Sequence, residues 1–255
     1  MIYRGLAITG TDTGVGKTTV AAALAALFRE QGLKVGALKP VETGCAGPDL
    51  IPGDGIRLAR AAGIALGEAE LPGSWTSASL AQVVPWRFAA PLAPEEAARQ
   101  AGTEISVDRI YQAMDRWMEQ ADLVLVETAG GLMVPINARF TFADLLNGLT
   151  LPVLIVAANR LGVINHVLLT LEALRRRDLQ PIAVALNMLS PLPDLSAATN
   201  AEVIRRRLDL PVYEVPYFTQ DEEGETVKAL RPRREAIRAA MEAEWRRVAA
   251  RYVKK

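Results

Sequence analysis

The stretch Leu6–Phe28, LAITGTDTGVGKTTVAAALAALF, joins an apolar strand-like run to an alanine-rich helical run through a glycine-rich turn. The turn ends in Gly16, Lys17 and Thr18. Glycines let successive backbone N–H groups point inward, and a helix beginning near Gly16 adds its positive end, so the turn is suited to phosphate. In such loops the lysine reaches the outer phosphates and the hydroxyl binds magnesium. The stretch therefore predicts a phosphate-binding loop.

The first glycine of this loop stands one residue earlier than usual. The common motif has a glycine where this chain has Thr11, and here the glycine is Gly10. A strand-like segment and a helical segment flank the loop as phosphate binding requires, so the prediction stands. The loop residues expected to contact the nucleotide are Gly14, Val15, Gly16, Lys17, Thr18 and Thr19.

Short aliphatic runs alternate along the chain with longer segments in which apolar residues recur at helical spacing. This alternation, with strands apolar on both faces, predicts an α/β fold: a single P-loop NTPase-like domain over residues 1–255, with a mostly parallel sheet flanked by helices on both faces. Ligands then bind at the carboxyl ends of the strands. The expected strands are Leu6–Thr9, Lys34–Leu38, Leu123–Val126, Val153–Ala157, Ile182–Leu186 and Val212–Val215, and the expected helices are Val20–Gln31, Val107–Gln120, Val163–Arg176 and Ala197–Leu208.

Composition narrows the class of partner. The chain has 255 residues, and its 29 basic and 29 acidic side chains cancel, so no overall field favours nucleic acid or a membrane surface. No apolar run is long enough to span a membrane. Cys45 is the only cysteine, which excludes an intrachain disulfide and suits the cytoplasm. Small-molecule ligands are therefore expected.

Two regions are harder to interpret. The segment Cys45–Pro94 is rich in glycine and proline and shows one clear helical patch, Asp54–Ala62, so we expect an elaborated loop region beside the site. The arginine-rich end, residues 231–255, is typical of an amphipathic closing helix with a solvated face. A binding arm is the alternative.

Charged residues follow the predicted strands at their carboxyl ends. Lys39 ends the second strand, and together with Lys17 it can neutralise a travelling phosphoryl group and an anionic acceptor. Glu127 ends the strand at Leu123–Val126 and is expected to bind magnesium or to position water. Asp54 opens the helical patch, where it is either an N-cap or a second magnesium ligand.

The late strand ends bear on the base of the nucleotide. Guanine-selective relatives carry Asn-Lys-x-Asp there, whereas this chain has ANRLG at 158–162 and LNMLS at 186–190, neither with that aspartate. ATP is therefore favoured. Asn187 either reads adenine, since an amide offers both a donor and an acceptor, or caps the strand end. His166 and Cys45 are the only histidine and thiol, so catalysis must depend on positioning and charge and not on a covalent nucleophile.

Longer motifs narrow the interpretation further. They are GTDTGVGKT (10–18), KPVETG (39–44), DGIRLARAAG (54–63), FAAPLAPEEAA (88–98), LVLVETAGGLMVPI (123–136), ANRLGVINH (158–166) and LPVYEVPYF (210–218). In sequence and order they resemble the dethiobiotin synthetases of biotin biosynthesis over almost the whole chain. Two positions depart from many members of that family, Thr128 after the acid and Glu95 after Pro94.

The resemblance implies an ATP- and Mg²⁺-dependent cyclisation. One amine of 7,8-diaminononanoate (7,8-diaminopelargonate) is carboxylated by CO₂ or bicarbonate, ATP phosphorylates the carbamate, and the second amine closes a cyclic urea. It implies that Lys17 and Lys39 are catalytic. It also implies a magnesium shell of Thr18, Asp54 and Glu127.

The resemblance further implies how the substrates lie. The turn LGVINH, residues 161–166, would hold the carboxylate of a diamine bound mainly by the neighbouring subunit, which implies a homodimer with sites at the interface. The implied substrate-binding residues are Thr13, Thr43, Leu161, Gly162 and Asn165, and the implied further ATP-binding residues are Asp54, Glu127, Gly130, Asn187, Pro216, Tyr217, Phe218 and Glu223.

Two other classes compete with this interpretation. A partitioning or division-site ATPase switch has the same fold but carries a lysine where this chain has Asp12. A synthetase domain of cobalamin synthesis usually comes with a glutamine amidotransferase domain, for which this chain has no room.

Overall fold

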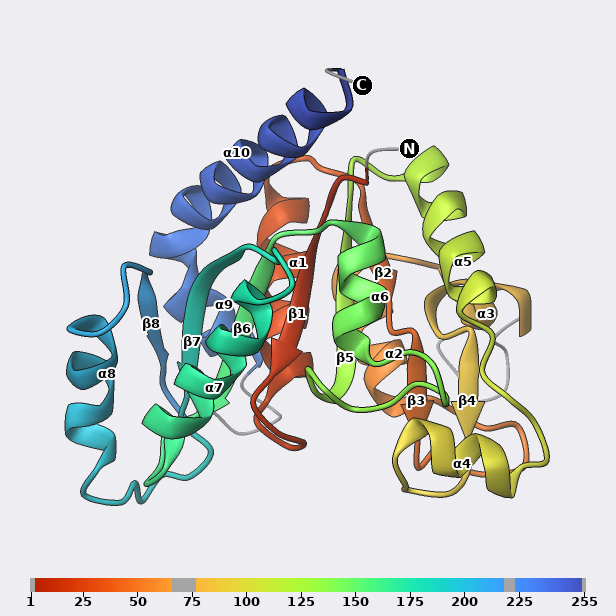
Figure 1. The fold of residues 1–255 in the computed structure, drawn as a ribbon, viewed down its shortest axis with the longest axis horizontal. Coiled ribbons are helices and arrows are strands. Elements are labelled where there is room, and N and C mark those ends of the chain that lie inside the picture. The colour runs from red at the N-terminus through yellow and green to blue at the C-terminus, as the bar shows by residue number, and fades with distance from the viewer. Residues whose placement is uncertain (1–2, 66–76, 218–222, 254–255) are drawn as a thin grey trace.

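The computed structural model describes residues 3–65, 77–217 and 223–253. Within these residues a six-stranded sheet runs in the order β2-β5-β1-β6-β7-β8, and all its pairings are parallel (Figure 1). The predicted α/β fold with its parallel sheet is therefore confirmed. The strands are β1 (Gly5–Gly10), β2 (Val35–Leu38), β5 (Leu123–Gly131), β6 (Val153–Ala158), β7 (Pro181–Asn187) and β8 (Val212–Val215).

Helices cover both faces of the sheet, because its central strands are apolar on both sides. In Figure 1, α6 (Phe142–Leu149) and α7 (Val163–Arg175) lie in front of the strands, and α1 (Lys17–Glu30) lies behind. Every residue of β1 and β6 is buried, so the core continues through the sheet from one helical layer to the other. The remaining helices are α2 (Gly53–Ala62), α3 (Ser77–Val83), α4 (Pro94–Gln100), α5 (Val107–Gln120), α8 (Ala197–Arg205), α9 (Glu223–Leu230) and α10 (Arg234–Val253), with a 3₁₀ turn at Arg231–Arg233.

Several predicted helix bounds need correction, some of them by a single residue: α1 ends at Glu30 and not at Gln31, and α2 begins at Gly53 and not at Asp54. The first helix begins at Lys17 and not at Val20, because Gly16 is its N-cap and the polar residues that follow are already helical. The periodic pattern misses this turn since it contains no apolar side chain. α8 ends at Arg205, three residues before the predicted end, and α7 ends one residue early, whereas α5 has the predicted bounds.

The region between Cys45 and Pro94 contains more regular structure than the single helical patch that the sequence indicates. Besides α2, it includes α3 and the strand β4 (Trp86–Phe88), which pairs in parallel with β3 (Val41–Thr43) in a second, two-stranded sheet. These elements are three to seven residues long. Segments this short do not complete a recognisable apolar period, which is why the sequence pattern misses them.

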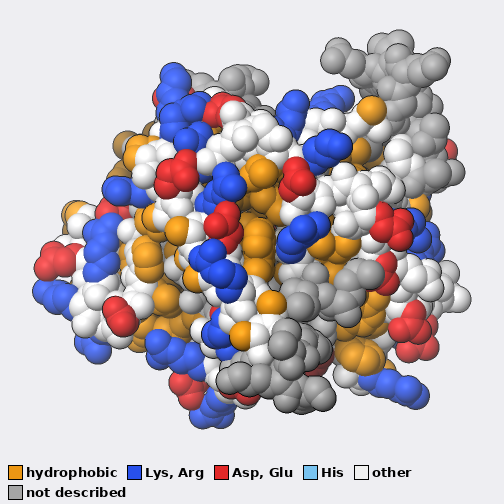
Figure 2. Space-filling model, turned by 90° about the horizontal axis from the view of Figure 1, so that it is seen from above, with side chains coloured by type: hydrophobic (Ala, Val, Ile, Leu, Met, Phe, Trp, Pro, Cys, Tyr) orange, Lys and Arg blue, Asp and Glu red, His pale blue; other side chains and the backbone are white. Residues whose placement is uncertain are grey.

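The C-terminal segment packs as the predicted closing helix. Ile237 and Met241 of α10 are buried, and Trp245 Nε1 donates a hydrogen bond of 2.9 Å to the carbonyl of Gly5 at the start of β1. Figure 2 shows the molecule from this end, where basic and acidic side chains are interspersed. Across the ranges that the structure describes, none of the helices is long and apolar enough to cross a membrane.

Candidate active site

The phosphate-binding loop connects β1 to α1 at the carboxyl edge of the sheet, the lower edge in Figure 1. Gly14 and Gly16 have φ of 68° and 88°, values that suit glycine and turn the backbone into a loop. A Cβ at Gly10 would lie 2.8 Å from the Asp12 carbonyl oxygen and 2.9 Å from Lys17 Nζ. The early glycine of the motif is therefore required, because the lysine side chain folds back over it.

Lys17 lies inside this loop. Its Nζ donates a hydrogen bond of 2.9 Å to the carbonyl oxygen of Asp12, and the side chain is 7% exposed. Burial lowers the pKa of Lys17 to about 8; the carboxylate of Glu127 opposes this shift, and the charge of Lys39 adds to it. A bound polyphosphate would favour the charged form and so offset the burial.

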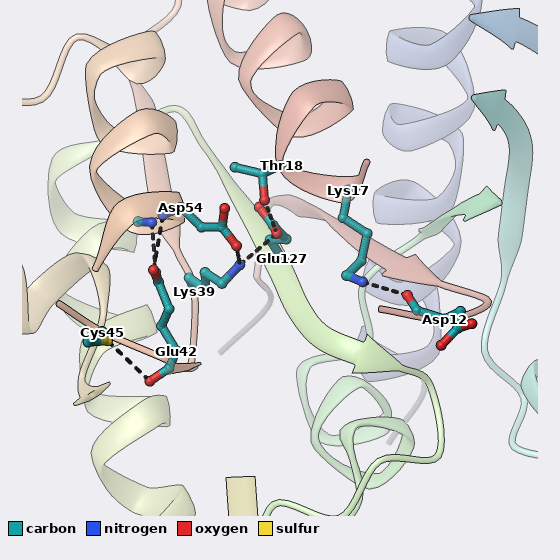
Figure 3. A network of polar contacts seen from close by, with 9 residues as sticks. Asp12, Lys17, Thr18, Lys39, Glu42, Cys45, Asp54 and Glu127 are labelled. Carbon is teal, nitrogen blue, oxygen red and sulfur yellow. Dashed lines mark hydrogen bonds and ion pairs between the residues drawn. The ribbon is translucent and has the colours of Figure 1, made fainter. Parts of the chain in front are cut away.

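Lys39, Asp54 and Glu127 point toward one another beside the first turn of α1 (Figure 3). Lys39 Nζ lies 2.5 Å from Asp54 Oδ2 and 2.8 Å from Glu127 Oε1. The Thr18 hydroxyl donates a hydrogen bond of 2.7 Å to the same Glu127 oxygen. The structure thus brings together four of the five side chains that the sequence predicts at the phosphates, from the residue after β2 and from α2, β5 and α1.

Lys39 and Asp54 shift each other's pKa toward the charged form. Burial alone would lower the pKa of Lys39, but the carboxylates of Glu127 and Asp54 outweigh burial and raise it. Burial would raise the pKa of Asp54, and the neighbouring Lys39 outweighs it, so that pKa is lowered. Removing one partner of such a buried pair leaves an uncompensated charge, which is strongly unfavourable.

Asp54 contributes to this cluster through its side chain and not as a helix cap. The N-cap of α2 is Pro52, and Asp54 lies inside the first turn. Of the two interpretations that the sequence leaves open, the N-cap is wrong.

The same residues offer a set of ligands that fits Mg²⁺. Glu127 Oε2 is buried and has no hydrogen-bond partner within the described part of the chain. The Thr18 hydroxyl and the half-exposed Asp54 carboxylate add two further oxygen groups. The described residues contain no group of three or more His, Cys, Asp or Glu side chains suited to a metal. Mg²⁺ takes one or two carboxylates and completes its shell with phosphate oxygens and water, and Asp54 and Glu127 offer that number of carboxylates.

Glu42 belongs to the site, although no role for it is predicted from the sequence. It lies on β3, is 7% exposed, and accepts hydrogen bonds from the backbone N–H groups of Asp54 at 3.0 Å and Gly55 at 2.8 Å. Burial raises its pKa, and Lys39 opposes the shift. An acidic residue between Val41 and Thr43, three residues after Lys39, was the signal available in the sequence.

Asn187 ends β7 against the phosphate loop. Its Nδ2 donates a hydrogen bond of 3.1 Å to the carbonyl of Val15, which leaves Oδ1 as an acceptor. Pro216 and Tyr217 follow β8, the strand next to β7. Phe218 and the side chain of Glu223, also predicted at the nucleotide, lie outside the described residues.

We predict that Gly16→Ala greatly weakens nucleotide binding. A Cβ there would lie 1.9 Å from Asn187 Nδ2, at a φ of 88°. Gly14→Ala is the matched control, since its φ of 68° carries a similar strain of about 1–2 kcal/mol but nothing described lies within 4 Å of the added carbon. Calorimetric titration with a non-hydrolysable ATP analogue should show the larger loss for Gly16→Ala. Equal losses would mean that the Asn187 contact has no influence on binding.

The turn at residues 158–166 lies next to the phosphate loop of its own chain. Gly162, with φ 92°, is the N-cap of α7, and the N–H of Leu161 donates to Asp194 Oδ2 at 2.9 Å. Arg160 pairs with Asp12 at 3.6 Å. Asn165 is exposed in the first turn of α7.

Thr13 and Thr43, the other predicted substrate contacts, come from the phosphate loop and from β3. Thr13 is exposed in the phosphate loop, and a Cβ at Gly130 would lie 3.4 Å from its methyl group, so Gly130 and Thr13 are neighbours. Thr43 ends β3, one residue after Glu42. Thr128 is fully buried and donates to the Thr9 hydroxyl at 3.1 Å, so its side chain is committed to a contact between β5 and β1.

Comparison with known proteins shows which family the chain resembles. A family model described as an AAA domain matches residues 4–220. The chain is 39% identical over 236 residues to the ATP-dependent dethiobiotin synthetase BioD of Thermodesulfovibrio yellowstonii, covering 87% of this chain and 93% of the relative. It is 44% identical over 203 residues to the ATP-dependent dethiobiotin synthetase BioD of Anaeromyxobacter dehalogenans, covering 80% of this chain and 85% of the relative. To the enzyme of the same name from Aquifex aeolicus it is 37% identical over 211 residues, covering 83% of this chain and 88% of the relative.

A solved structure gives a likeness of fold only. The structure titled apo McdA from Cyanthece matches with a TM-score of 0.53 at 13% identity, covering 93% of this chain and 99% of that one. At that identity the likeness does not distinguish between functions built on one fold.

Proposed function

Because the chain belongs to the dethiobiotin synthetase family, we propose that it closes the ureido ring of dethiobiotin from 7,8-diaminononanoate and CO₂ with ATP. The observation that carries this proposal is the position of Lys39. Its ammonium group is buried between Asp54 and Glu127 beside the phosphate loop, where two anions, a carbamate and a phosphoryl group, have to meet.

The reaction proceeds in three bond-forming steps. One amine attacks CO₂ and loses a proton, which gives a carbamate. A carbamate oxygen attacks the γ-phosphorus of ATP and ADP leaves. The second amine attacks the carbonyl carbon and loses a proton, so that a C–N bond forms, the C–O bond breaks and phosphate departs. The substrate supplies every nucleophile, which suits a site whose described residues combine charge with hydroxyl groups.

Lys17 and Lys39 stabilise the negative charge in these steps. Lys17 binds the outer phosphates from within the loop, while Lys39 holds the carbamate oxygen in line with the γ-phosphorus. Fixed charges in a site that excludes water act strongly on such a transition state. Magnesium, held by Thr18, Asp54 and Glu127, would supply further positive charge at the phosphate oxygens.

The nucleotide is ATP. Asn187 Nδ2 is held by the carbonyl of Val15, so its Oδ1 is fixed as an acceptor. An acceptor matches the exocyclic amine of adenine and opposes the carbonyl oxygen that guanine has at the same place. Pro216, Tyr217, Phe218 and Glu223 complete this end of the site in the proposal.

The protein acts as a cytoplasmic homodimer in which the turn at 161–166 binds the substrate carboxylate of the neighbouring subunit. An exposed aliphatic patch supports this assembly. Leu161 is 80% exposed, and Leu192 and Leu195, on either side of its hydrogen-bond partner Asp194, are 85% and 98% exposed. Exposed apolar side chains gathered in this way are typical of an interaction surface.

We predict that ADP release depends on the diamine and equals dethiobiotin formation mole for mole. The purified chain would be incubated with ATP, Mg²⁺ and bicarbonate, with and without 7,8-diaminononanoate, and ADP and product would be measured in the same samples. Lys17→Ala is the control for contaminating ATPases. Rapid ADP release that ignores the diamine would contradict the proposal and favour an ATPase switch.

A further inference from the structure

Glu42 has no part in the chemistry described above, yet it is a buried carboxylate next to that chemistry. Its two oxygens accept from two consecutive backbone N–H groups, those of Asp54 and Gly55, in the first turn of α2 (Figure 3). First-turn amides have no partner within their own helix, and a carboxylate there is favoured by both hydrogen bonding and the helix dipole. The side chain therefore anchors the start of α2 to β3.

The fit at this contact is close. A Cβ at Gly55 would lie 2.2 Å from Val84 Cγ2 and 3.3 Å from Glu42 Oε2. Only glycine lets the first turn approach the strand closely enough for both hydrogen bonds. Val84 follows Val83, whose carbonyl accepts from the N–H of Lys39 at 2.8 Å, so one short segment supports both Lys39 and α2.

These contacts form a closed ring. Lys39 and Glu42 are joined by the backbone, Glu42 holds the Asp54 amide, and the Asp54 carboxylate returns to Lys39 Nζ at 2.5 Å. The side chain of Asp54 is 50% exposed, so packing alone does not hold its carboxylate in place. The hydrogen bond from the Asp54 N–H to Glu42 fixes the backbone from which that carboxylate extends.

We propose that Glu42 is a positioning residue that fixes Asp54 for magnesium and Lys39. The inference rests on the proposed role of Asp54 as a magnesium ligand. Both oxygens of Glu42 are used by amides, so it acts through Asp54 and not as a ligand itself. Partners that orient metal ligands in this way are typically worth 10–100-fold in metal affinity or activity, and we expect about that factor here.

The first test observes the amides directly. In the wild type, the Asp54 and Gly55 N–H groups should exchange with solvent slowly for a first helical turn, as followed by NMR. In Glu42→Gln, which has the same shape but one acceptor oxygen, their exchange should be roughly tenfold faster or more. Wild-type amides that exchange as fast as uncapped first-turn amides would overturn the proposal.

The second test measures Mg²⁺ affinity by calorimetric titration of protein bound to a non-hydrolysable ATP analogue. Glu42→Gln should weaken it by about 10–100-fold. Asp144→Asn is the matched control, because Asp144 also accepts an amide at a helix start, from Thr141 at 2.8 Å, but on α6. It should lower the melting temperature and leave Mg²⁺ affinity unchanged. Equal effects of the two substitutions on affinity would overturn the proposal.

Two further variants separate positioning from general stability. In an Asp54→Ala background, Glu42→Gln should change turnover by less than about twofold, because the residue it acts through is gone; additive losses would contradict this.

Gly55→Ala keeps the carboxylate but displaces its partner, so it should weaken Mg²⁺ binding as well. It serves as the test if Glu42→Gln does not fold. Amide exchange and Mg²⁺ affinity need no diamine, so failure of dethiobiotin formation and failure of this proposal are distinguishable.

Discussion

The Lys39→Ala variant should turn over about 10²–10³ times more slowly than the wild type, the usual loss for one electrostatic contact made in a transition state. ATP binding should change little, because Lys39 is paired with Asp54 and Glu127 and the phosphate loop carries its own lysine. A charge used mainly in the transition state affects turnover before affinity. Steady-state kinetics and titration with an ATP analogue measure the two quantities.

Lys34→Ala is the control for this experiment, since Lys34 lies five residues earlier and is exposed. It should behave as the wild type. Circular dichroism should first show that Lys39→Ala is folded, because the buried Glu127 loses a partner. Near-normal turnover in folded Lys39→Ala would mean that the ion pair serves the structure and not the reaction.

The second large effect is recovery of activity from two inactive chains. In the proposed dimer, Lys17 acts on its own ATP, and Asn165 acts on the substrate of the neighbouring subunit. Lys17→Ala removes the phosphate contact. Asn165→Asp sets an acid against the substrate carboxylate. A heterodimer of the two variants would contain one site with both parts intact, so mixing them should restore up to about half of the activity per heterodimer.

Native mass spectrometry would confirm that the subunits exchange. Substrate should also stabilise the dimer, because a ligand that touches both subunits favours the assembled state. The Arg160–Asp12 pair places the turn beside the phosphate loop of its own chain, an arrangement that also fits a turn serving its own subunit. The mixing experiment distinguishes the two arrangements. Confirmed heterodimers without activity would mean that the turn serves its own subunit.

Local patterns were enough to predict much of the site. Lys17 and Thr18 belong to a contiguous motif, and Lys39 follows β2, whose pairing with β5 ends at Val126, just before Glu127. Glu127 was predicted to follow its strand, but β5 continues to Gly131; the two side chains still meet at the carboxyl edge of the sheet, where parallel strands bring their ends together. That these side chains lie close together was therefore predictable from the fold class alone. The six main strands were predicted for the same reason, since each is a continuous apolar run.

Contacts that depend on packing between distant segments could not be predicted. The sequence left Asp54 open between a cap and a ligand, because the choice depends on where α2 packs against β3. Glu42 was missed since its partners are backbone amides, which no side-chain pattern reveals. The link between Leu161 and Asp194 joins loops after neighbouring strands and has no local signal either.

The proposed ring closure can be followed directly by isotope labelling. The purified protein would be incubated with 7,8-diaminononanoate, ATP, Mg²⁺ and ¹³C-bicarbonate, and the product analysed by mass spectrometry. We expect dethiobiotin that carries the label in its ureido carbon. None should form when ATP is left out, or when Lys39→Ala replaces the wild type at equal concentration and short times. A folded protein that binds ATP and forms no labelled dethiobiotin would contradict the proposed ring closure.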